Sequence, residues 1–85
     1  MYYVYILKCG NGEFYKGFTA DLRERLARHQ RGEVPSTAGC LPVELVFYCA
    51  FVNKYKALAF EKYLKSGSGR AFMNKRFVSS GRDTG

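Results

Sequence analysis

The fold of this chain is decided by residues 2–19, which read YYVYILKCGNGEFYKGFT. Residues 2–8 and 13–18 of this stretch are rich in aromatic and β-branched side chains, which favour extended strands. Between them lies GNG at residues 10–12, a sequence typical of the turns of β-hairpins. The stretch therefore predicts two short strands that pair antiparallel.

The length of the turn decides which side chains share a face of this hairpin. If residues 10–12 form a three-residue loop, Tyr5 lies opposite Gly17, and Tyr5 and Tyr15 lie on the same face of the sheet. Gly17 has no side chain, so this pairing would leave space for the Tyr5 ring. A two-residue turn at residues 11–12 would place the two tyrosines on opposite faces.

The next part of the chain predicts a helix, a loop and a third strand. Thr19 or Asp21 can cap a helix that ends at Gly32. Residues 33–41 contain proline, glycine, serine and threonine without any periodicity, and we expect a loop there. Residues 43–51 are mostly apolar and β-branched or aromatic, and they predict a buried third strand.

Two more helices are predicted in the C-terminal part. Asn53 can cap a helix over residues 54–65, which the sequence SGSG at residues 66–69 ends as a linker. A short third helix over residues 70–77 follows.

The element order β-β-α-β-α-α predicts a small single α/β domain over residues 1–78, with a flexible tail over residues 79–85. Strands joined by a hairpin are antiparallel, so we expect a three-stranded antiparallel sheet flanked by helices. Both alternate rows of side chains on the first strand are apolar or aromatic. This pattern predicts that helices cover both faces of the sheet.

Composition narrows the class of protein. The chain has 85 residues, 47% of them hydrophobic, and a formal net charge of +7. This length allows one domain, and the charge favours a polyanionic partner, with nucleic acid ahead of an anionic membrane surface.

The longest apolar run, residues 2–7, is too short to span a bilayer and does not resemble a signal peptide, so we expect a cytoplasmic protein without a membrane partner. The three cysteines are widely spaced and predict reduced thiols rather than disulfides or a zinc site.

Three polar side chains are predicted beside apolar helix stripes. Arg25 and His29 are four residues apart on the first helix and lie next to the stripe of Leu22. Glu61 lies at the edge of an apolar stripe on the second helix, where Lys65 is its one good local ion-pair partner. The plain structural interpretation is a snorkelling arginine, a hydrogen-bonded histidine and a local ion pair. For Tyr5 and Tyr15 on the predicted strands, the plain structural interpretation is packing of their rings.

Five segments agree in order and spacing with a known family. They are Tyr3-Val4-Tyr5, Tyr15-Lys16-Gly17, Asp21-Leu22-x-x-Arg25-Leu26-x-x-His29-x-x-Gly32, Pro42-Val43-Glu44-Leu45 and Glu61-Lys62-x-Leu64-Lys65. Together they resemble the GIY-YIG nuclease domain of small stand-alone bacterial proteins, over residues 1–77. Two positions of the name-giving tripeptides depart from the family pattern, since Tyr3 replaces a glycine and Lys16 replaces an isoleucine.

The resemblance implies a fold, a reaction and a set of site residues. It implies a three-stranded antiparallel sheet flanked by helices, a divalent cation (Mg²⁺ or Mn²⁺), and hydrolysis of phosphodiester bonds in nucleic acid. Carried over by position, the catalytic residues are Tyr5, Tyr15, Arg25, His29 and Glu61, with Glu61 as the metal ligand. Excision-repair members have a lysine where this chain has Phe18. An asparagine near the end of the domain is functional in several members, and Asn74 lies at a suitable distance but is not aligned with it. Both tyrosines stay candidates for the general base, and their sharing of a face favours the three-residue turn.

The basic residues of the C-terminal third are candidates for phosphate contacts. The predicted nucleic-acid-binding residues are Lys65, Ser68, Arg70, Lys75 and Arg76. Backbone N–H groups of residues 66–69 could also face a phosphate. The alternative for this region is a solvated helix surface.

The sequence thus predicts a metal-dependent endonuclease, with DNA favoured and cleavage directed by the structure of the substrate rather than by its sequence. The alternative is a catalytically silent nucleic-acid-binding module of the same fold, and a small RNA-associated protein is a third possibility. Retention of Tyr5, Tyr15, Arg25 and Glu61 favours the enzyme. The sequence leaves the oligomeric state open.

Overall fold

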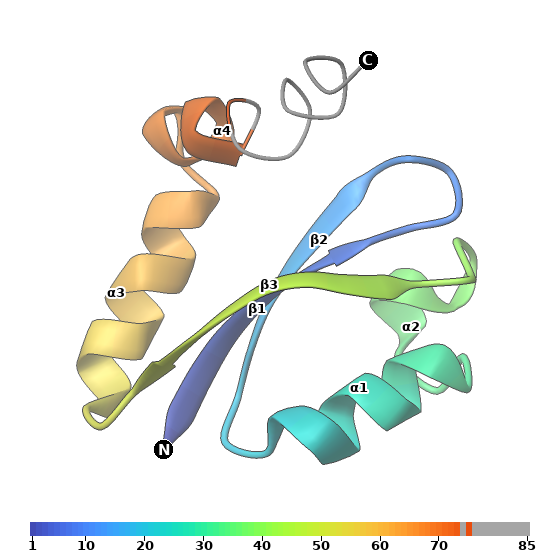
Figure 1. Ribbon diagram of the computed structural model, residues 1–85, viewed down its shortest axis with the longest axis horizontal. Helices are drawn as coiled ribbons and strands as arrows, with labels where there is room; N and C mark the ends of the chain where they lie inside the picture. The colour runs from blue at the N-terminus through green and yellow to red at the C-terminus, as the bar shows by residue number, and fades with distance from the viewer. Residues whose placement is uncertain (74, 76–85) are drawn as a thin grey trace.

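The computed structural model describes residues 1–73 and 75 of the chain. In this part of the chain the elements are, in order, β1 (Tyr2–Lys8), β2 (Phe14–Thr19), α1 (Leu22–Gln30), α2 (Pro35–Ala38), β3 (Glu44–Phe51), α3 (Lys54–Leu64) and α4 (Gly67–Met73). They form an α/β domain around a three-stranded antiparallel sheet (Figure 1). The predicted fold class is confirmed.

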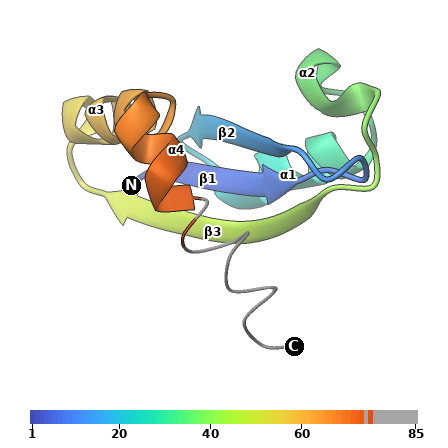
Figure 2. The same ribbon diagram turned by 90° about the horizontal axis from the view of Figure 1, so that it is seen from above.

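Strand β1 is the centre of the sheet, whose strand order is β2-β1-β3 (Figure 2). Val4 and Ile6 of β1 lie in one apolar core, with Leu64 of α3 and Met73 of α4. Leu7, on the other face of β1, lies in a second core against α1 and the segment before β3. Helices therefore cover both faces, with α3 and α4 on one and α1 and α2 on the other (Figure 1), as the two apolar rows predicted.

The hairpin between β1 and β2 has the three-residue loop. Tyr5 pairs with Gly17, and Leu7 pairs with Tyr15. The Cys9 N–H donates to the Glu13 carbonyl at 2.8 Å and so closes the loop. Gly12 has φ +88°, a left-handed conformation that glycine adopts without steric cost. The odd-length turn places Tyr5 and Tyr15 on one face of the sheet.

Side-chain caps fix where the two longer helices begin. Asp21 accepts a hydrogen bond from the Glu24 N–H at 3.1 Å and is the N-cap of α1. Asn53 accepts from the N–H groups of Tyr55 and Lys56 and caps α3. Of the two predicted caps of α1, Asp21 fills the role, while Thr19 accepts a hydrogen bond from the Asp21 N–H.

Three sequence predictions are corrected. The predicted loop over residues 33–41 contains α2, whose single turn starts with Pro35 at the first helical position and is too short to show periodicity. The predicted linker over residues 66–69 belongs largely to α4, because the Ser66 hydroxyl accepts a hydrogen bond from the Gly69 N–H and starts that helix. Strand β3 is an edge strand with half-buried and exposed residues rather than a buried strand, since one side of it has no neighbour in the sheet.

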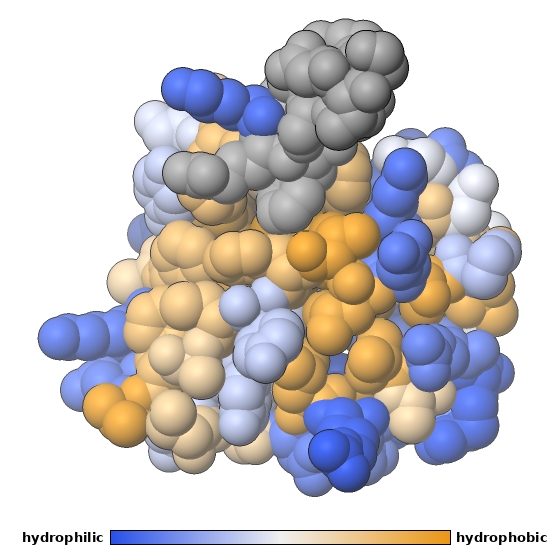
Figure 3. Space-filling view, in the orientation of Figure 1, coloured by the Kyte–Doolittle hydropathy of each residue, from blue (hydrophilic) through white to orange (hydrophobic). Residues whose placement is uncertain are grey.

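The end of the predicted third helix after Met73, apart from Lys75, lies outside the described residues, as do the predicted domain end at residue 78 and the tail over residues 79–85. Within the described part, no helix has the length and apolar character needed to cross a bilayer. Cys9, Cys40 and Cys49 are all free thiols. Apolar side chains form a band across the middle of the surface (Figure 3).

Candidate active site

A chain of three buried polar side chains links β1, α1 and α2. The Tyr5 hydroxyl lies 2.8 Å from His29 Nε2, and His29 Nδ1 lies 2.7 Å from the Thr37 hydroxyl. Tyr5 is 1% exposed, and His29 and Thr37 are fully buried. Both ring nitrogens of His29 are therefore used, so the imidazole is fixed in position between the strand and the short helix.

The charge state of His29 follows from this environment. Burial lowers the pKa of His29, and the nearby cationic Arg25 and Arg28 lower it further. A neutral imidazole has one donor and one acceptor nitrogen, so it can accept a hydrogen bond from one of the two hydroxyls and donate one to the other. A neutral His29 therefore satisfies both contacts without a buried charge.

Gly17 determines where the Tyr5 ring lies. A Cβ atom at position 17 would collide with the Tyr5 ring carbon Cζ and with its hydroxyl oxygen. The ring of Tyr5 therefore lies against the backbone of β2. Tyr15, two residues earlier on β2, lies on the same side, with its ring centroid 6.3 Å from that of Tyr5 and 5.2 Å from that of His29. The two motif tyrosines and the histidine form one aromatic cluster.

Arg25 of α1 borders this cluster and has unused hydrogen-bonding capacity. Its charge and a hydrogen bond to the Tyr5 hydroxyl both act to lower the pKa of Tyr5. Arg25 Nε is buried and has no hydrogen-bond partner among the described residues. A buried charged donor without a partner is costly, and such groups are typical of functional sites.

The pKa of Tyr5 rises to about 12 in spite of Arg25. Burial is the largest cause, and the neighbouring Tyr15 adds to it, whereas Arg25 lowers the pKa and Glu61 raises it. A neighbouring cation such as Arg25 can activate a tyrosine by lowering its pKa. The direction of that effect is right, but at Tyr5 desolvation is larger, so Tyr5 keeps its proton at neutral pH.

Glu61 lies on α3, which covers the opposite face of the sheet from α1. Its carboxylate still raises the pKa of Tyr5, so it lies close enough to the Tyr5 hydroxyl for electrostatic interaction. The Tyr5 ring crosses Gly17 of β2, which is an edge strand of the sheet. Glu61 is 19% exposed and pairs with Lys65 at 3.2 Å, the local partner expected from the sequence.

The donor set around Glu61 limits which cation it could hold. The described residues contain no group of three or more His, Cys, Asp or Glu side chains able to hold a metal ion. A transition-metal site with several protein ligands therefore does not fit this part of the chain. A single accessible carboxylate fits Mg²⁺ or Mn²⁺, because Mg²⁺ commonly keeps several waters and takes phosphate oxygens as further ligands.

A cluster of positive side chains lies beside the same strand. Burial lowers the pKa of Lys16 on β2, and the cationic Arg70 and Lys65 lower it further. Lys16 and Arg70 also line a cavity of 310 Å³ together with Glu13 and Met73. A place where neighbouring cations disfavour the charge of a lysine favours the binding of an anion.

The structure brings together some of the predicted residues and adds two that sequence reasoning missed. Tyr5, Tyr15, Arg25 and His29 meet on one side of β2, and Glu61 approaches from α3. Of the predicted nucleic-acid contacts, four are exposed in the structure, namely Lys65, Ser68, Arg70 and Lys75. Arg76 and the unaligned Asn74 lie outside the described residues.

The missed residues are Thr37 and Lys16. Thr37 holds His29 from α2, and the segment gave no periodic signal that could have shown a buried residue there. Lys16 could have been found as a lysine between two residues of an otherwise aromatic and apolar strand.

Comparisons with known proteins agree with this architecture. A family model described as the GIY-YIG catalytic domain matches residues 1–76. A UPF0213 protein of Lacticaseibacillus paracasei is 45% identical over 65 residues, which cover 75% of this chain and 73% of that protein. A UPF0213 protein of Streptococcus pneumoniae serotype 4 is 41% identical over 64 residues, which cover 74% of this chain and 65% of that protein. The solution NMR structure of a UPF0213 protein of Bacillus halodurans has a TM-score of 0.56 and 34% identity, covering 88% of this chain and 84% of that one.

Proposed function

This chain belongs to the GIY-YIG catalytic domain family, and from that membership we propose that it is a metal-dependent endonuclease that hydrolyses phosphodiester bonds in nucleic acid. DNA is the proposed substrate, recognised by its structure rather than by its sequence. The observation that carries this proposal is the meeting of Tyr5, Tyr15, Arg25 and His29 at the edge strand β2, with the charge of Glu61 reaching the same hydroxyl.

Arg25 binds the scissile phosphate in this proposal. Its guanidinium is always charged and offers two parallel donors, which suit a phosphate better than a single ammonium does. The buried Nε without a partner indicates that the side chain has donor capacity left for a ligand. Arg25 therefore offsets the negative charge that develops on the phosphoryl oxygens.

The two tyrosines take different roles. With a pKa of about 12, only roughly one Tyr5 in 10⁵ is ionised at pH 7. Tyr5 is therefore a neutral donor, held in place by His29, that orients the groups around it. Tyr15 is only half-buried and so is accessible to water, which makes it the better candidate for the general base.

Glu61 would hold Mg²⁺ or Mn²⁺, which when bound supplies positive charge at the phosphate and lowers the pKa of its waters. Glu61 pairs with Lys65 through Oε2, so its other carboxylate oxygen has no ion pair among the described residues and is available to a cation.

The positive cluster binds the nucleic-acid backbone next to this site. Arg70 and Lys65 lie close enough to Lys16 to lower its pKa, and Lys16 and Arg70 share a cavity. Phosphate groups would neutralise this repulsion, and the resulting binding should weaken as salt concentration rises.

Two observations favour a second candidate, the catalytically silent nucleic-acid-binding module. Lys65 already neutralises Glu61, and Tyr5 is far from ionised at neutral pH. A protein that binds through Lys16, Lys65 and Arg70 without cutting would be compatible with both facts.

Incubation with a panel of DNA substrates separates these two functions. The panel contains branched, flapped, nicked, single-stranded and plain duplex DNA, each with Mg²⁺, with Mn²⁺ and with a chelator. We expect cleavage of at least one branched or flapped substrate that requires the cation and is absent from a Tyr15→Phe variant purified in parallel. Binding of these substrates without cleavage under any metal condition would contradict the endonuclease and support the binding module.

A further inference from the structure

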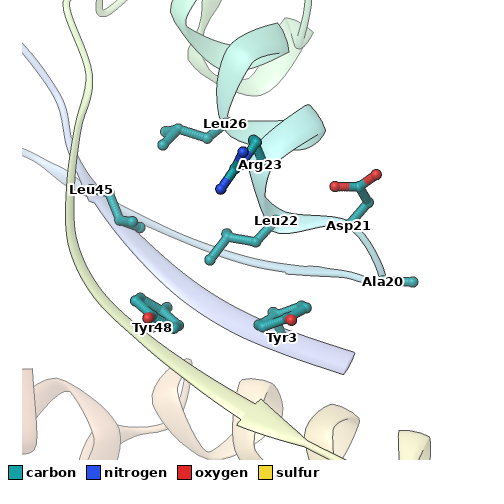
Figure 4. A pocket seen from close by; sticks show the side chains of 8 residues that line it. All are labelled: Tyr3, Ala20, Asp21, Leu22, Arg23, Leu26, Leu45 and Tyr48. Carbon is teal, nitrogen blue, oxygen red and sulfur yellow. The ribbon is translucent and has the colours of Figure 1, made fainter. Parts of the chain in front are cut away.

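A second cavity lies on the α1 face of the sheet, away from the hydroxyl of Tyr5. It has a volume of 420 Å³ and opens between the start of α1 and strands β1 and β3 (Figure 4). Tyr3 and Tyr48 lie side by side on the sheet, with ring centroids 6.4 Å apart and tilted by 57°. Leu22 of α1 and Leu45 of β3 complete the apolar wall. This cavity lies within the size range of sites for small molecules.

We propose that this cavity takes an unpaired base of the nucleic-acid substrate, next to the phosphate that is cut. This proposal rests on the proposed function, because it names a part of the substrate of the same site. Aromatic rings are the surfaces on which nucleic-acid bases stack, whatever their sequence. Tyr48 is 54% exposed, so its ring already offers a face to a ligand.

The charges at the cavity favour a base over a phosphate. Arg23 and Asp21 both line the cavity, so a cation and an anion lie at the same opening. A phosphate would be repelled by the Asp21 carboxylate, whereas the amino and carbonyl groups of a base can use both charges. The cavity at Lys16 and Arg70 has two cations beside the one carboxylate of Glu13, and this excess of positive charge suits a phosphate, so the two cavities differ in the ligand they fit.

The position of the cavity relative to the candidate active site suits neighbouring parts of one strand. Tyr3 and Tyr5 are two residues apart on β1, so they lie on the same face at a spacing of about 7 Å. Tyr48 is the direct partner of Tyr5 across β1 and β3. On α1, Leu22 lines the cavity three residues before Arg25. A phosphate bound at Arg25 would therefore have its adjoining base within reach of the cavity.

The sequence adds a second reason. Tyr3 stands at the position where the first tripeptide of the family has a glycine. A glycine there would remove one of the two aromatic rings and leave Tyr48 without its neighbour. The departure from the family pattern thus supplies the aromatic wall of the cavity.

Binding measured without cleavage tests this proposal. Fluorescence anisotropy in the presence of a chelator would compare a labelled flap substrate that carries an unpaired strand with a plain duplex. We expect Tyr48→Ala to weaken binding of the flap substrate by about tenfold or more, the size of a lost base–aromatic stack, and to leave duplex binding unchanged. Tyr48→Phe keeps the ring and should bind like the wild type. The salt dependence should not change, because no phosphate contact is lost.

Tyr55→Ala is the matched control, since Tyr55 is a 78% exposed tyrosine on α3 that does not line the cavity. Tyr48→Leu is a second variant that keeps apolar volume and should show the same loss as Tyr48→Ala. An abasic position that weakens binding by wild type but not by Tyr48→Ala would identify the base concerned.

Two outcomes overturn the proposal, and they are distinguishable. If Tyr48→Ala and Tyr55→Ala both bind the flap substrate as the wild type does, the cavity holds no base, while the endonuclease can still stand on its own cleavage test. The proposed function itself fails if the wild type binds none of the nucleic-acid substrates, and the base site fails with it.

Discussion

The packing of Tyr5 against Gly17 makes Gly17→Ala a test of how the site is built. The added Cβ would collide with ring carbon Cζ and the hydroxyl of Tyr5. Tyr5 is 1% exposed and hydrogen-bonded to His29, so its ring has no free space to move into. Overpacking of this kind costs about 1–3 kcal/mol, and loss of the hydrogen bond to His29 costs about 1 kcal/mol more.

The expected loss is thus about 2–4 kcal/mol of unfolding free energy, which for a domain of this size lowers Tm by at least about 8 °C. Thermal and urea unfolding followed by circular dichroism would measure both quantities. Gly39→Ala is the matched control, because a Cβ at Gly39 meets no atom within 4 Å and its φ of −89° suits alanine. That variant should keep the wild-type Tm or exceed it slightly.

A double variant tests the cause of the loss. In a Tyr5→Leu background the ring is absent, so Gly17→Ala should cost much less than it does in the wild type. The reasoning would be refuted if Gly17→Ala alone changed Tm by less than about 2 °C, or if its cost were the same with and without the Tyr5 ring.

Three further predictions concern charge and proton state. Arg25→Lys should keep the fold but lower single-turnover cleavage by about a hundredfold, since an ammonium cannot replace the guanidinium fork, and an unchanged rate would assign Arg25 to structure alone. Because the folded-state pKa of His29 is lowered, its contribution to stability is present above the unfolded pKa of about 6.5 and is lost as pH falls below it. The urea midpoint should therefore drop between pH 7.5 and 5.5, and His29→Gln should flatten that drop; equal slopes in both proteins would contradict the assignment. Burial raises the pKa of the Cys9 thiol to about 11, so mass spectrometry after alkylation at pH 8 should find Cys9 unmodified in the folded protein and modified in urea, and rapid modification of the folded form would contradict its burial.

Local signals in the sequence predicted much of the fold. The GNG turn predicted the hairpin and limited its register to two alternatives, of which the structure has the three-residue loop, and the caps at Asp21 and Asn53 act within one helical turn. The apolar rows on both sides of β1 predicted helices on both faces, because side chains alternate strictly along a strand. Each of these features depends on neighbours in the sequence, so it can be deduced without the tertiary structure.

Features that depend on distant parts of the chain were not predictable in this way. The edge position of β3 follows from the strand order, which only the pairing of β1 with both other strands determines. The contact of Thr37 with His29 requires a four-residue helix that has no periodic signal. The high pKa of Tyr5 arises from burial under α1, which no local pattern reports.

The residues of the candidate site could be named from residue types at positions that match the family motif. Their arrangement in space could not be predicted in this way. Sequence reasoning named Arg25, His29 and Glu61 as polar residues beside apolar stripes, and it gave Lys65 as the partner of Glu61, which the ion pair at 3.2 Å confirms. It did not predict that the charge of Glu61 acts on Tyr5, because this depends on how α3 packs on the sheet.

The central claim, that Glu61 makes this domain a metal-dependent endonuclease, is tested most directly by cleavage and binding of one flap substrate by wild type and Glu61→Gln in Mg²⁺. Glutamine keeps the size of the side chain but removes the charge that captures the cation. Glu33→Gln is the control, since Glu33 is also an ion-paired carboxylate but pairs with Arg28 and Arg31 around the end of α1 rather than with a lysine of α3. We expect Glu61→Gln to bind the substrate at least as well as the wild type, with a Tm close to it, and to have no detectable cleavage, whereas Glu33→Gln cuts normally. Cleavage by Glu61→Gln at the wild-type rate would contradict the claim.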